Sequence, residues 1–138
     1  MGRPIAFLRL YFAAEDCDTG QRGRLAFSPR ETAGLDVAFE DDESGARAGM
    51  EAFYTGPQAL DENPHRGVAP AYVTLGLLAS RQLGRANVYL NFENITNMRQ
   101  SRFDPLLRPT PGAGGRRTVD ERAPLEGRTV NAGVRVRP

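Results

Sequence analysis

Two alternating stretches that meet at a two-residue turn constrain this chain most. Apolar and polar residues alternate over 71–83 and again over 86–97, and only Gly84 and Arg85 lie between them. A period of two is typical of β-strands, and so short a glycine-containing connection is typical of a β-hairpin. Each arm is about 12 residues long, whereas a globular strand has about 5 or 6. Because tilted strands of about 9–11 residues cross a bilayer, a transmembrane β-barrel is the first hypothesis.

The composition excludes several other classes of protein. A length of 138 residues is close to the typical size of one domain, about 150 residues. The 18 basic residues, all arginine, are offset by 17 acidic residues, which argues against a nucleic-acid partner. Cys17 is the only cysteine and His65 the only histidine, so we expect no disulfide, no metal site and no cofactor. No apolar run approaches the roughly 18 residues of a membrane helix, so any membrane span must be β.

The other predicted strands and their connections also favour a transmembrane β-barrel. Alternation predicts further strands over 5–13, 32–40, 46–55 and 128–137. The third of these is imperfect because Phe53 lies among polar neighbours, and a helix competes there, although glycines weaken it. Long connections at 14–31, 56–70 and 98–127 alternate with short ones at 41–45 and 84–85. Outer-membrane barrels have tight periplasmic turns and long extracellular loops. We therefore expect an all-β chain of about six antiparallel up-and-down strands forming part of a transmembrane β-barrel.

Several short motifs carry a resemblance to a known family. The chain reads NFENITN over 91–97, FDPLLRP over 103–109 and APLEGR over 123–128, with SPR over 28–30 and EAFYTGPQAL over 51–60 further upstream. In this order and spacing the motifs resemble the C-terminal barrel strands of TonB-dependent outer-membrane receptors. The resemblance covers roughly residues 7–137 and is most specific over 86–137.

The resemblance implies a receptor that takes up a scarce nutrient, most often a ferric siderophore, across the bacterial outer membrane. Such a receptor makes and breaks no bond, so we expect no enzyme activity and no catalytic residue. Residues 1–138 would be the C-terminal barrel segment, with outer-membrane lipid as a partner. The plug domain, the TonB box and an export signal are expected only in the full-length protein, which alone would engage the TonB system. Family members generally end on an aromatic residue, whereas this chain ends on Pro138.

The candidate site residues lie in the expected outer loops and on the expected lumen face. In the last long loop arginines outnumber acidic residues, and such a cationic mouth would attract an anionic ferric siderophore. The ligand-binding candidates are His65, Arg66, Arg99, Arg102 and Arg108, and the lumen-facing or plug-facing candidates are Asn91, Glu93 and Asn94. A solvated loop and a hydrated lumen remain the plainer interpretations. A metal-sensing group of His65 with Asp61 and Glu62 is the least favoured.

A soluble all-β module that binds a ligand, either a sandwich or a half-barrel, is the alternative hypothesis. Its alternating faces would pack on each other and form a core. The two hypotheses differ at one belt of apolar residues, which a membrane barrel leaves uncovered and a soluble module covers. That belt consists of Val88, Leu90, Phe92, Val130, Val134 and Val136.

Overall fold

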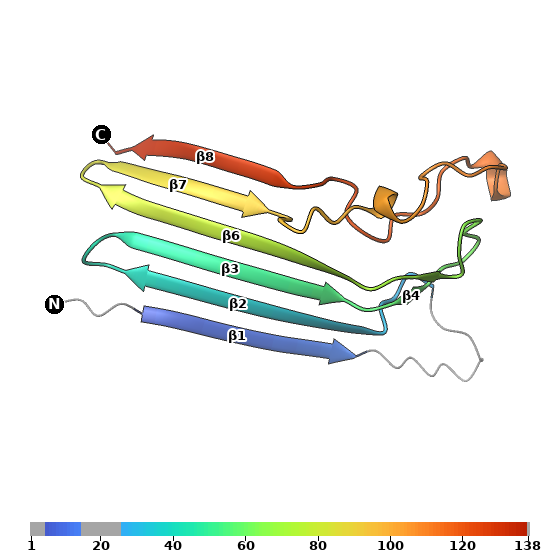
Figure 1. Ribbon diagram of the computed structural model, residues 1–138, viewed down its shortest axis with the longest axis horizontal. Coiled ribbons are helices and arrows are strands. Elements are labelled where there is room, and N and C mark those ends of the chain that lie inside the picture. Colours follow the sequence, from blue (N-terminus) through green and yellow to red (C-terminus); the bar gives the residue numbers. More distant parts are fainter. Residues whose placement is uncertain (1–4, 15–25, 138) are drawn as a thin grey trace.

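A six-stranded antiparallel sheet dominates the computed structural model, which describes residues 5–14 and 26–137. Its strands are β1 (Ile5–Ala14), β2 (Glu31–Asp41), β3 (Ala46–Thr55), β6 (Tyr72–Leu83), β7 (Ala86–Glu93) and β8 (Thr129–Val136). Each strand pairs antiparallel with the next in the order β1-β2-β3-β6-β7-β8, as Figure 1 shows. The predicted all-β class and up-and-down order are confirmed. The sheet is open and does not close into a barrel, because β1 and β8 form its two edges.

The two short turns lie at one end of the sheet and the described long connections at the other (Figure 1). In the turn between β2 and β3, the carboxylate of Asp41 accepts hydrogen bonds from the Glu43 amide at 3.1 Å and the Ser44 hydroxyl at 2.6 Å. Gly45 and Gly84 have φ of +62° and +60°, a region that glycine adopts without a Cβ penalty. The turn residues thus account for both tight reversals.

The other strands end within one residue of their predicted bounds, and the larger differences lie at β7 and in the connections. β7 ends at Glu93, four residues before the expected limit of 97, because Asn94 has a φ of +49° that leaves the extended conformation. The connection expected over 56–70 contains a small ribbon, β4 (Gln58–Ala59) paired with β5 (Val68–Ala69). The last connection holds two 3-10 helices, η1 (Gln100–Arg102) and η2 (Ala113–Gly115). Much of the connection expected over 14–31 lies outside the described residues.

The register divides the sheet into an apolar and a polar face. Directly opposed residues share a face, and one such row contains Val37, Met50, Leu77, Phe92 and Val130. A row of the other face contains Gly49, Leu78, Asn91 and Asn131. Hydrophobic and polar residues therefore largely segregate as the alternation predicts, with Phe53, Tyr72, Leu78 and Tyr89 among the large exceptions on the polar face and Arg81 an exception on the apolar face.

The apolar face is uncovered. Val88, Val134 and Val136 are 39%, 62% and 67% exposed, Leu90 and Val130 are also exposed, and Phe92 is half-buried. The buried apolar residues of the described chain are Ala69, Met98 and Ala123, all at the long-loop end. Within residues 5–14 and 26–137, the sole other sheet is the β4–β5 ribbon, so no second layer packs on the belt as a sandwich would require. No helix in the described ranges has the length and apolar character to cross a membrane.

Candidate functional site

A cleft of about 720 Å³ opens at the long-loop end of the polar face. Its sheet wall comes from Thr32, Thr55 and Tyr72, which are directly opposed on β2, β3 and β6, together with Phe53. Its other walls are Phe27, Pro29, Gln58 and residues 121–124. Three aromatic rings thus meet an acidic and a basic residue at one site. Phe53, which breaks the alternation of its strand, has a place in this cleft.

Backbone pairing with β4 holds Phe27 in position. The Phe27 amide donates to the Ala59 carbonyl at 2.8 Å, and the Arg30 amide donates to the Pro57 carbonyl at 3.1 Å. Phe27 has a φ of +63°, which is uncommon for a bulky residue. The segment before β2 is therefore tied to the ribbon, and Phe27 reaches the cleft from there.

The opposite wall is fixed by hydrogen bonds to the backbone of Arg122. The side-chain Nε2 of Gln58 lies 3.3 Å from the Arg122 carbonyl oxygen, and the Tyr72 hydroxyl lies 3.5 Å from the same atom. Gln58 is buried, so its bond to this carbonyl satisfies a group that water does not reach. A residue of the last long loop is thereby anchored to the sheet and to the ribbon.

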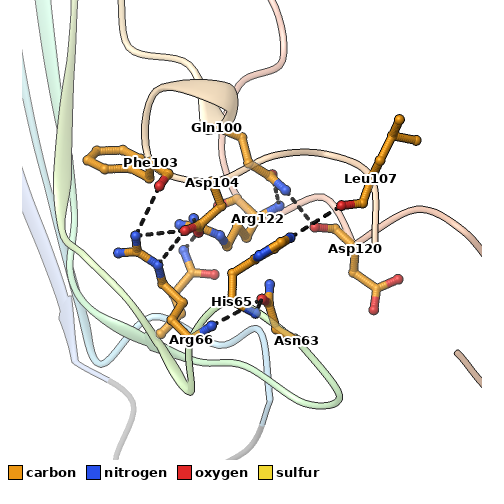
Figure 2. Close-up of polar contacts among 10 residues, drawn as sticks. Asn63, His65, Arg66, Gln100, Phe103, Asp104, Leu107, Asp120 and Arg122 are labelled. Carbon is orange, nitrogen blue, oxygen red and sulfur yellow. Dashed lines mark hydrogen bonds and ion pairs between the residues drawn. The ribbon is translucent and has the colours of Figure 1, made fainter. Parts of the chain in front are cut away.

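Behind this wall lies a group of three charged side chains, the Arg66–Asp104–Arg122 triad (Figure 2). Arg66 approaches Asp104 Oδ1 with Nε at 2.9 Å and Nη2 at 2.7 Å, while Arg122 Nη2 lies 2.6 Å from Oδ2. Arg66 Nη2 also donates to the Phe103 carbonyl at 3.1 Å. The triad connects the two long loops that the structure describes in full, 56–71 and 94–128.

Gln100 joins the triad to the backbone of the same loop (Figure 2). Its side chain is 1% exposed, donates to the Asp120 carbonyl at 2.8 Å and accepts from the Arg122 amide at 2.8 Å. The Gln100 amide donates to the Pro124 carbonyl at 2.8 Å. One buried glutamine thus fixes residues 120–124, which line the cleft.

The electrostatics of the triad are unbalanced. Two guanidinium groups share one carboxylate, which leaves a net charge of +1 on the three side chains. The Arg122 side chain is 1% exposed, and its Nε and Nη1 atoms have no hydrogen-bond partner among the described residues. Its guanidinium carbon lies 5.8 Å from the centre of the Phe103 ring, within reach of a cation–π interaction. Buried donors without acceptors are rare and require an explanation.

Three of the five predicted ligand-binding residues, His65, Arg66 and Arg102, contact other residues of the loops. Arg66 belongs to the triad, and the His65 Nε2 atom lies 3.3 Å from the Leu107 carbonyl oxygen (Figure 2). Arg102 donates to the Asn97 carbonyl at 3.2 Å, and the Arg108 Nε atom is buried without a partner among the described residues. Arg99 is exposed. None of these five lines the cleft.

The three lumen candidates separate into two groups. Asn91 and Glu93 share the polar face of β7, and their side chains hydrogen-bond at 2.8 Å. Asn94 lies beyond the strand, where its side chain donates to the Met98 carbonyl at 2.7 Å and accepts from the Met98 amide at 2.8 Å. Asn94 therefore stabilises the turn that follows β7.

None of the residues that line the cleft belongs to the predicted site, and Arg122 and Phe53 show two different reasons. Arg122 is one of six arginines in an aperiodic loop, so no pattern distinguishes it from the others. Phe53 did carry a signal, because it is a large apolar residue at a polar-face position. Across the described chain, no three His, Cys, Asp or Glu side chains gather as a metal site would need, so His65, Asp61 and Glu62 are not brought together.

No protein-family model matches the chain, and neither a curated protein nor a solved structure matches it significantly.

Proposed function

We propose that the chain is the C-terminal wall segment of a TonB-dependent outer-membrane receptor whose long loops face the cell exterior. The uncovered apolar face carries the proposal. Soluble monomers rarely expose contiguous apolar patches beyond a few hundred Å². Here large apolar residues extend across β2, β3, β6, β7 and β8 without a covering layer among the described residues. Such a face is suited to contact with the acyl chains of a lipid bilayer.

The polar face and the sheet edges support the same role. Asp36, Glu51 and Asn91 lie on the polar face, where a barrel lumen would hydrate them. The backbone groups at the outer edges of β1 and β8 require partners in hydrocarbon, and neighbouring strands of a complete barrel supply them. The plug domain and the TonB connection belong to that complete protein.

The cleft is the proposed place of ligand capture. It opens on the polar face at the long-loop end and combines the rings of Phe27, Phe53 and Tyr72 with Arg122. Aromatic rings suit a large planar or apolar ligand, and a ferric siderophore presents many acceptor oxygens. Such oxygens would complement the net positive charge of the triad behind the cleft wall. Binding and passage need no chemical step.

No specific observation favours the soluble module. A sandwich or half-barrel requires the belt to be covered, whereas its valines are among the most exposed apolar residues. We therefore propose the receptor alone.

The genomic reading frame around the coding sequence tests the proposal first. We expect an upstream plug domain and TonB box in the same frame, and a separate promoter and start at Met1 would contradict the proposal. The second step measures binding of iron-loaded hydroxamate and catecholate siderophores by the protein encoded in that frame. Phe53→Ala should weaken binding by about tenfold or more, as truncation of an aromatic anchor does.

Phe39→Ala is the matched control for this measurement. Phe39 and Phe53 are 40% and 37% exposed, but they lie on opposite faces of the sheet. The control should bind like the parent protein. Equal loss in both variants, or loss in neither, would contradict the assignment of the cleft.

A further inference from the structure

A groove of about 370 Å³ crosses the apolar face over β3 and β6. Its floor is formed by Ala48 and Ala79, which are directly opposed, and its walls are Phe39, the partner of Ala48, and Leu90, the partner of Ala79. Two small residues between two large ones produce a depression that the backbone register fixes. We call this depression the alanine groove.

The alanine groove has one closed end and one open end. On the long-loop side, the next row places Met50 opposite Leu77, and these larger side chains close it. On the short-turn side, the next row places Ala46 opposite Arg81. Rows on one face are about 6.6–6.8 Å apart along a strand, so the Arg81 side chain starts one row beyond the floor. The open end of the alanine groove therefore leads to Arg81.

Arg81 has two basic neighbours at that end. Arg85 lies in the turn between β6 and β7, and the Arg137 amide donates to the Arg85 carbonyl at 2.9 Å. All three arginines are exposed, and none of their guanidinium groups forms an ion pair or hydrogen bond with another described residue. The nearest acidic residue in the row of Arg81 is Asp41, about two strand spacings or 9.5 Å away.

We propose that the alanine groove and its arginines form a seat for one anionic phospholipid. The groove takes an acyl chain and Arg81 binds the phosphodiester, while Arg85 and Arg137 add positive charge at the same end of the sheet. The inference rests on the proposed function, because it places the apolar face in the membrane. In that topology the short turns lie at the periplasmic leaflet. Charge complementarity selects an anionic lipid, since juxtamembrane arginines attract negatively charged headgroups.

Spin-labelled lipids measure this preference on the full chain reconstituted in vesicles. The motionally restricted fraction is compared for labelled phosphatidylglycerol and labelled phosphatidylcholine, in a phosphatidylcholine host. We expect the restricted fraction to favour phosphatidylglycerol. Arg81→Gln should lower that preference by about fivefold, which corresponds to about 1 kcal/mol for one arginine at a membrane surface. Ala48→Phe should fill the groove and reduce the restricted phosphatidylglycerol without changing the arginines.

Arg135→Gln is the matched control, because Arg135 is exposed near the same end but belongs to the polar face. It should keep the parent preference. Equal restriction of both lipids by the parent chain, or equal effects of Arg81→Gln and Arg135→Gln, would overturn the lipid seat and leave the proposed function standing. A chain that restricts no lipid at all would overturn both, because its apolar face would then not contact the bilayer.

Discussion

Asp104 and Arg122 form a buried ion pair at the long-loop end, with 2.6 Å between Asp104 Oδ2 and Arg122 Nη2. Their side chains are 6% and 1% exposed. Arg66 supplies the second cation to the same carboxylate. The loops therefore contain the most buried part of the described chain, whereas the sheet has two accessible faces.

Removing the shared carboxylate should disorder the loops. Asp104→Asn leaves the Arg122 guanidinium buried without a counter-charge, and breaking a buried pair costs about 3–5 kcal/mol. Amide hydrogen exchange over residues 98–127 should accelerate. Asp120→Asn is the control, because the Arg116–Asp120 pair is largely accessible, with side chains 44% and 35% exposed. Loss of that pair should cost less than about 1 kcal/mol. Similar exchange in both variants would refute a structural role for the triad.

Gln100 should be sensitive to an apolar replacement of similar size. Gln100→Leu keeps the volume but leaves the Asp120 carbonyl and the Arg122 amide without partners, at a cost of about 1–3 kcal/mol. Chemical denaturation of the full chain in detergent micelles measures this difference. Gln82→Leu removes only an accessible bond to the Gly84 carbonyl and should change stability by less than about 0.5 kcal/mol. Equal stability of the two variants would contradict the buried network.

Two turn glycines with similar backbone angles should respond differently to alanine. Gly45 and Gly84 have φ of +62° and +60°, so each alanine carries a strain of about 1–2 kcal/mol. A Cβ at Gly45 would also lie 2.6 Å from the Gln82 Cβ, whereas nothing lies within 4 Å at Gly84. Thermal unfolding should show Gly45→Ala as the less stable variant. The reverse order would mean that the turn between β2 and β3 does not pack on β6.

A charge on the apolar face should be expensive only in a bilayer. Leu90→Arg places a guanidinium among acyl chains and should destabilise the inserted chain by about 1–2 kcal/mol, between the cost of about 2–4 kcal/mol at the midplane and about 0–1 kcal/mol near the interface. Asn91→Arg puts the same charge on the polar face of the same strand and should have a much smaller effect. Denaturant unfolding from vesicles measures both. A soluble protein with a hydrated apolar face would tolerate the two substitutions equally.

The periodic parts of the chain could be predicted and the aperiodic parts could not. The strand at 46–55 has the expected bounds because alternation and glycine turns are local signals. β7 ends early because the Asn94 side chain hydrogen-bonds to the Met98 backbone and forms a turn in place of strand pairing. The alternation of apolar and polar residues does not reveal such a turn. Arg122 gains its place from Asp104, Gln58 and Tyr72, all distant in sequence. Local sequence patterns cannot predict contacts between residues that are so far apart in the chain.

Collision accessibility on neighbouring residues of β7 tests the central claim most directly. A spin label is placed at Leu90 or at Asn91 in a Cys17→Ser background, and the full chain is reconstituted in vesicles. We predict that the label at 90 collides with oxygen dissolved in the bilayer and that the label at 91 collides with a water-soluble nickel complex. Equal access of the nickel complex to both positions would contradict a lipid-facing apolar side.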